Sequence, residues 1–112
     1  MIFNINKSNL YYSPALAVIA NGIDIGHVHP LGDTLIYNAT GRIDQLKKII
    51  HCEESLIELI SFLNSYRKQH GYIALCIDDY MSGIVQLKSI SFWTNLGFIY
   101  SCDNPKLLYL LD

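Results

Sequence analysis

Two short groups of residues in this 112-residue chain have side chains and spacing that could do chemistry. His27 and His29 stand two residues apart. In a β-strand that spacing puts both imidazole rings on one face, which is workable geometry for binding a metal ion. His51 and Cys52 are adjacent at an expected helix start, where a thiol can have a lowered pKa and act as a nucleophile or a redox group.

Each group also has a simpler interpretation. No cysteine or carboxylate close to the histidines in sequence completes a metal site, so we interpret them as surface residues before the turn at Pro30. Glu53 and Glu54 follow Cys52 directly, and their negative charges oppose formation of a thiolate. The sequence therefore predicts no metal site and leaves a reactive Cys52 as a minor hypothesis.

The composition is that of one ordinary globular domain spanning residues 1–112, with 51% hydrophobic residues, 16% charged residues and a net charge of -2. The eight Lys and Arg residues are spread along the chain, so no nucleic-acid partner is indicated. No apolar run approaches the roughly 20 residues that span a membrane, and the N-terminus lacks the pattern of a signal peptide, so we expect a cytoplasmic protein. The cysteines are odd in number and lack paired spacing, which favours free thiols: Cys52, Cys76 and Cys102.

The first half of the chain has the pattern of an antiparallel meander. Ala15–Ile25 contains two strand-like runs that are broken at Asn21-Gly22, which is the strongest two-residue hairpin signal. A second pair of strands is expected at Thr34–Tyr37 and Arg42–Ile50.

The second half changes to a helical period. Apolar side chains from Leu56 to Tyr66 form the wide stripe of a core-facing helix, which Ser55 and Glu58 begin as an S-x-x-E capping box and Gly71 ends. The elements expected after this helix are a central strand at Tyr72–Ile77, a helix at Gln86–Asn95, and strands at Phe98–Ser101 and Leu107–Leu111. This order predicts an α/β (α+β) fold with a mixed, mostly antiparallel sheet and two main helices.

One local signature adds to this order. The spacing N-x-x-A-x-x-F/L-Y, followed by x-x-x-G-F, is matched in register by Gln86, Ser89, Phe92 and Trp93, with Gly97 and Phe98 after them. Over residues 34–112 the chain thereby resembles the GNAT family of acetyl-CoA-dependent N-acetyltransferases. The family usually has one or two helices between its first two strands, but here only Lys7–Pro14 link them, which implies an unusually open acceptor side.

The resemblance implies a site for acetyl-CoA at the start of the first main helix. Family members bind the pyrophosphate there behind a Q/R-x-x-G-x-G/A loop, whose glycines let backbone N–H groups approach the phosphates. Neither glycine position holds glycine here, and two glutamates occupy the helix start, so an ordinary capped helix is favoured over a preserved phosphate cradle. The candidate cofactor-binding residues are Lys48, Ile49, Ile50, His51, Cys52 and Ser55, with Gln86 and Trp93 from the closing helix.

The resemblance also implies that a base deprotonates an amine and that a tyrosine protonates the departing thiolate. Trp93 replaces the usual tyrosine, and its indole N–H has no useful acidity. Tyr80 and Tyr100 are the candidate replacements for the tyrosine. The carboxylates available as the base are Asp44, which is the candidate, and the Asp78-Asp79 pair. For all of these, packing or solvated turn roles are the simpler interpretation.

Two functions follow as hypotheses. The chain is either a divergent acyltransferase that moves an acetyl or acyl group from CoA to an amine, such as a protein lysine, or a scaffold that has lost catalysis and binds a protein partner as an inhibitor or regulator. The missing motif residues favour the second, and fold analogy favours the first. The distinguishing feature is whether the strand before Cys52 splays from Tyr72–Ile77 to leave a cleft, or whether Trp93 and its neighbours close it.

Overall fold

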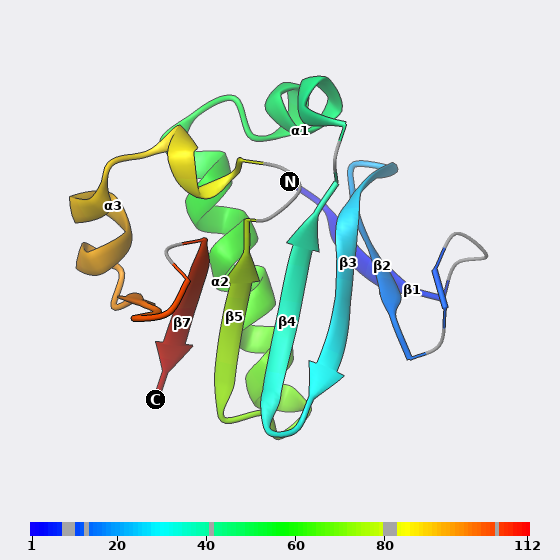
Figure 1. Cartoon of the computed structure of the whole chain (residues 1–112). Coiled ribbons are helices and arrows are strands. Elements are labelled where there is room, and N and C mark those ends of the chain that lie inside the picture. Colours follow the sequence, from blue (N-terminus) through cyan, green and yellow to red (C-terminus); the bar gives the residue numbers. More distant parts are fainter. Residues whose placement is uncertain (8–10, 13, 41, 80–82, 105) are drawn as a thin grey trace.

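The computed structural model describes residues 1–7, 11–12, 14–40, 42–79, 83–104 and 106–112. They form a mixed α/β domain with one mostly antiparallel sheet, as the sequence predicted (Figure 1). The elements in chain order are β1 (Phe3–Asn6), β2 (Leu16–Ala20), β3 (Ile23–Leu31), β4 (Thr34–Ala39), α1 (Ile43–Ile49), α2 (Glu53–Gln69), β5 (Ala74–Asp78), the 3-10 helix η1 (Val85–Leu87), α3 (Ile90–Asn95), β6 (Ile99–Tyr100) and β7 (Leu107–Leu111).

The sheet has the strand order β1-β2-β3-β4-β5-β7-β6. All neighbouring strands are antiparallel except β4 and β5, which run parallel because α1 and α2 carry the chain back across the sheet between them. Helix α2 crosses behind the sheet, while α1 and η1 lie at the end of the sheet where β4 and β5 finish (Figure 1). None of the described helices is long and apolar enough to cross a membrane.

The predicted hairpin at Asn21-Gly22 is confirmed, since β2 and β3 pair antiparallel on either side of it. Both turn residues have positive φ, at 50° and 82°, as a tight hairpin turn requires. A β-bulge follows, where the register shifts between Val18 and Ile19. Opposite it, Gly26 has φ 140° and lies against the backbone of Asn38, so a side chain would not fit there.

The predicted strand at Arg42–Ile50 is wrong, because this segment contains helix α1. Its apolar residues Leu46, Ile49 and Ile50 recur at helical spacing, and all three are buried. Asp44 lies in the first turn and two lysines in the last, which suits the helix dipole.

Helix α2 is confirmed, although its N-cap lies three residues earlier than the Ser55 that the S-x-x-E pattern predicted. Cys52 is the N-cap, and the side chain of Ser55 bonds back to it, so Glu58 plays no part in the cap. The apolar stripe of α2 packs on the sheet, with Leu56, Leu59 and Leu63 at most 1% exposed.

The predicted helix at Gln86–Asn95 is interrupted. Its first residues form η1, the backbone then becomes extended at Lys88, and α3 starts afresh with Ser89 as its N-cap. The Ser89 hydroxyl accepts a hydrogen bond from the Phe92 amide, which explains the new start. The helix ends as predicted at Gly97, which has φ 98°.

The two faces of the sheet differ. One row of paired residues, made of Val28, Tyr37, Ile77 and Leu108, is at most 1% exposed and belongs to the core. The next row along the same strands has the opposite orientation and holds His29, Ile36, Cys76 and Tyr109. No described helix lies in front of this second face (Figure 1). The residues described between β1 and β2 likewise form no helix, in agreement with the short link in the sequence.

Strand β5 is confirmed as a strand that is buried on both faces. Its residues Ala74, Leu75, Cys76 and Ile77 are at most 2% exposed. On the helix-free face, the small side chain of Cys76 lies between the larger side chains of Ile36 and Tyr109, which are its partners in register.

Candidate functional site

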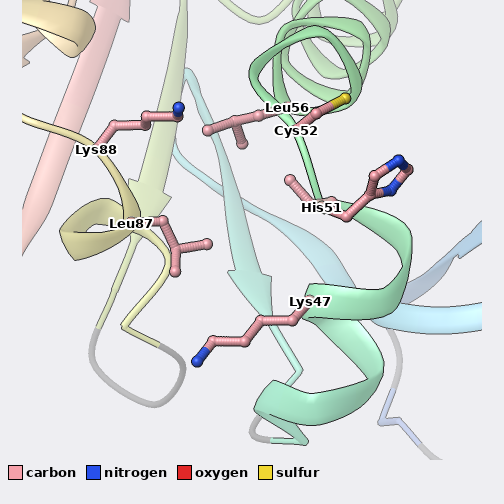
Figure 2. A pocket seen from close by; sticks show the side chains of 7 residues that line it. Lys47, His51, Cys52, Leu56, Leu87 and Lys88 are labelled. Atoms are coloured by element: carbon pink, nitrogen blue, oxygen red, sulfur yellow. The ribbon is translucent and has the colours of Figure 1, made fainter.

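A cavity of about 320 Å³ lies at the N-terminus of α2 (Figure 2). It is built at the end of the sheet where the parallel strands β4 and β5 finish, because α1 and the start of α2 follow β4 while η1 follows β5. Ligands of open α/β sheets commonly bind at the carboxyl ends of the strands. The lining residues are Lys47, Ile50, His51, Cys52, Leu56, Leu87 and Lys88.

The two lysines come from opposite walls. Lys47 belongs to the last turn of α1 and extends towards the η1 side, whereas Lys88 follows η1 and extends towards α2 (Figure 2). Ile50, Leu56 and Leu87 give the cavity an apolar lining. An anion with an apolar portion therefore fits the chemistry of this cavity.

The backbone at the start of α2 is already engaged. Cys52 donates its amide to the Ser55 hydroxyl at 3.3 Å, and that hydroxyl lies 3.1 Å from the Cys52 sulfur. Hydrogen bonds from the Ser55 side chain, and then from the Ser55 backbone amide, lower the pKa of Cys52, against smaller raising effects of desolvation and of the Glu54 charge. Cys52 and Ser55 thus cap the start of α2 by themselves.

The structure brings only part of the predicted cofactor-binding set together. Ile50, His51 and Cys52 line the cavity. Ser55 is buried beneath Cys52. The remaining residues lie elsewhere: Lys48 is exposed and Ile49 buried on α1, Gln86 lines another cavity, and Trp93 is fully buried.

The predicted catalytic residues lie apart from one another. Tyr80 falls outside the described residues. Asp44 is exposed in the first turn of α1 and lines neither the α2 cavity nor the one described next. Tyr100 lines a second cavity of about 270 Å³ with Asp79, Gln86 and Lys88.

Asp79 affects the protonation of Tyr100 in this second cavity. Asp79 is 4% exposed, and its carboxylate accepts a hydrogen bond from the Val85 amide at 3.1 Å. Burial raises the pKa of Tyr100, and the negative charge of Asp79 raises it further, so the phenol keeps its proton at neutral pH. Lys88 lines both cavities, so the two cavities are neighbours at the segment that contains η1.

The segment expected to be the strand before Cys52 is helix α1, so the strand beside β5 is β4, and it does not splay from β5 over the paired length. The parallel register of β4 with β5 continues from Thr34 and Ala74 to Asn38 and Asp78, the last residue of β5. Beyond it, Trp93 is fully buried and its indole N–H donates to the Val85 carbonyl at 2.8 Å. The cleft implied by the family resemblance is thus closed along the paired strands.

His27 and His29 do lie on one face, as predicted, with their rings 5.7 Å apart. The ring of Tyr11 packs at a tilt against His27, with the ring centroids 4.6 Å apart, and its hydroxyl donates to Asp24 at 3.0 Å. Burial, and then the nearby charge of His29, lower the pKa of His27. Among the residues described, no three His, Cys, Asp or Glu side chains are placed to hold a metal ion.

Lys47 and Lys88 were missed at the sequence level. The only signal for Lys47 was the helical spacing of Leu46, Ile49 and Ile50, which was interpreted as a strand. Ser89 carried the signal for Lys88, since an N-cap at that position puts the preceding residue outside the helix. Comparisons of the chain with protein-family models, with curated proteins and with solved structures gave no match.

Proposed function

We propose that the chain binds acetyl-CoA, or another acyl-CoA, in the cavity at the start of α2 and transfers the acyl group to an amine. The observation that carries this proposal is the position of Lys47 and Lys88 on opposite walls of a cavity with an apolar lining at the ends of β4 and β5. The family resemblance led us to expect the cofactor at the same helix start.

The cavity has residues that suit acyl-CoA, but they differ from the glycine-rich loop of the family. The backbone amides of a glycine-rich loop are replaced by a start of α2 that Cys52 caps, so recognition of the phosphates is assigned to the two lysine ammonium groups. Ile50, Leu56 and Leu87 would contact the apolar part of the pantetheine arm. When bound, the group supplies an acyl thioester: the amine nitrogen bonds to its carbonyl carbon, the C–S bond breaks, the amine loses a proton to a base and the thiolate gains one.

Proton transfer is assigned to Asp79 and Tyr100, which line the neighbouring cavity that shares Lys88 with the α2 cavity. There Asp79 supplies a carboxylate that can accept the amine proton, and Tyr100 supplies a hydroxyl that can donate to the thiolate. Because its pKa is raised, Tyr100 is a weaker acid than an ordinary tyrosine. We therefore expect slow transfer of the acyl group.

Binding and transfer are tested separately. Calorimetric titration with CoA should give saturable binding by the wild type and at least tenfold weaker binding by Lys47→Glu, whereas Lys68→Glu, an exposed lysine at the far end of α2, should bind like the wild type. Release of free thiol from acetyl-CoA in the presence of a lysine peptide then measures transfer. Absence of binding by the wild type at millimolar CoA would contradict the proposal.

The helix-free face of the sheet favours a second candidate function, in which the chain is a non-catalytic scaffold that binds a protein. His29, Ile36 and Tyr109 are partly exposed there, and Leu31, Ile99 and Leu111 at the ends of its rows are more than half exposed. Aromatic and apolar side chains on an open sheet face suit a protein partner. A photo-cross-linking residue at Tyr109 should then capture a protein, whereas the same residue at Ile90 on α3 should not.

A further inference from the structure

The ammonium group of Lys88 forms an ion pair with Glu53 of helix α2. It lies 3.6 Å from a carboxylate oxygen of Glu53 in the first turn of α2, and 5.8 Å above the ring of Phe92. The Lys88 side chain is 32% exposed and the Glu53 side chain 59%. The pair lies at the border between the α2 cavity and a neighbouring cavity that both residues line.

We infer that Glu53 is an internal counter-ion that occupies Lys88 and must be displaced when an anionic ligand enters the α2 cavity. This inference depends on the proposed function, because the ligand in question is the phosphate group of CoA. A half-exposed ion pair is weak, and a phosphate carries more charge and offers several oxygens to an ammonium group, so the exchange of partners is favourable. Glu53 then sets how tightly the cavity takes an anion.

If the ligand takes the place of Glu53 on Lys88, the effect of removing Glu53 must depend on the presence of Lys88. If Glu53 acts by holding Lys88, its removal frees the ammonium group for the ligand and tightens binding. If Glu53 acts only as a nearby negative charge, its removal tightens binding whether or not Lys88 is present. A double-mutant cycle between the two positions separates these effects.

Glu54 provides the matched control. It lies in the same first turn of α2 and forms no salt bridge among the described residues. Both glutamates are exposed, so their replacement by glutamine should leave the fold intact. Circular dichroism and the melting temperature of each variant check this point.

The test is calorimetric titration of CoA into the wild type, Glu53→Gln, Glu54→Gln, Lys88→Gln and the Glu53→Gln/Lys88→Gln double variant. We expect Glu53→Gln to lower the Kd about three- to tenfold, and Glu54→Gln to change it less than twofold. In the Lys88→Gln background the gain from Glu53→Gln should disappear, and raising the salt concentration should shrink it.

The outcomes distinguish the two proposals. Binding of CoA by the wild type that is tightened by Glu53→Gln, but neither by Glu54→Gln nor in the Lys88→Gln background, supports both. Binding by the wild type with no gain in Glu53→Gln, or with an equal gain in Glu54→Gln or in the Lys88→Gln background, overturns the counter-ion role and leaves the proposed function standing. No binding by any of the five proteins overturns both.

Discussion

The indole N–H of Trp93 donates a hydrogen bond to the carbonyl oxygen of Val85 at 2.8 Å, and both side chains are buried. This bond joins α3 to η1, whose residues line both cavities. Phe92 and Phe98 pack edge-on against the same indole ring. Where the family resemblance implied a catalytic tyrosine, this chain has a structural tryptophan.

Trp93→Phe keeps an aromatic ring but leaves the Val85 carbonyl without its indole donor. Loss of a buried hydrogen-bond partner should lower the free energy of unfolding by about 1–3 kcal/mol. Ile90→Ala on the exposed side of α3 is the control and should change stability by about 0.5 kcal/mol or less. Urea denaturation measures both, and equal stabilities of Trp93→Phe and the wild type would contradict the structural role.

Gly26→Ala should disrupt the bulge between β2 and β3. A Cβ atom there would overlap the backbone carbonyl oxygen of Asn38, and φ 140° is unfavourable for alanine. Gly22→Ala is the matched control, because that glycine also has positive φ but meets no atom within 4 Å. We expect a loss of about 1 kcal/mol for the control and a loss at least twice as large for Gly26→Ala, measured by thermal unfolding.

The alkylation rate of Cys52 should report on the α2 cavity. The pKa of Cys52 is lowered by its hydrogen bonds with Ser55, whereas burial raises the pKa of Cys76 to about 11. Iodoacetamide should therefore modify Cys52 much faster than Cys76 at pH 7, as followed by mass spectrometry of peptides. Ser55→Ala should slow the reaction of Cys52 without affecting exposed Cys102, and saturating CoA should protect Cys52. Equal rates for Cys52 in the Ser55→Ala variant and the wild type would show that the hydrogen bonds do not activate this thiol.

The fold should lose stability on acidification through His27. Burial and the charge of His29 lower its pKa in the folded state, against smaller raising effects of Asp24 and Asp78. The unfolded chain, with a histidine pKa of about 6.5, binds more protons over the window just below that value, so the free energy of unfolding falls as the pH falls through it. His27→Gln should flatten this dependence between pH 7 and pH 5, and exposed His51→Gln should retain it. Identical pH profiles for His27→Gln and the wild type would rule out this contribution.

Much of the fold could be predicted from local pattern. The hairpin at Asn21-Gly22, the apolar stripe of α2 and strand β7 each carry a strong and unambiguous period. Arg42–Ile50 was misinterpreted because a short segment with three apolar residues near its end fits a strand or a helix until packing decides. The break at Lys88 depended on Ser89 as a new N-cap, which competes with an otherwise continuous helical spacing.

These same two segments supply the lysines of the cavity, which explains why the site was only partly predicted. Once Arg42–Ile50 is a helix, its rotation directs Lys47 rather than Lys48 to the cavity. Once the chain is extended at Lys88, that side chain reaches across to Glu53. His51 and Cys52 could be placed from sequence because they immediately precede a helix whose period was clear.

Where CoA binds is the most direct test of the account, and amide NMR spectra of the 12.7 kDa chain can show it during a titration. We expect the largest shift changes at Lys47, at residues 50–56 and at Leu87 and Lys88, with little change at His29, Ile36 and Tyr109 on the helix-free face. Unchanged spectra at millimolar CoA, or changes confined to that face, would contradict a cofactor site at the start of α2.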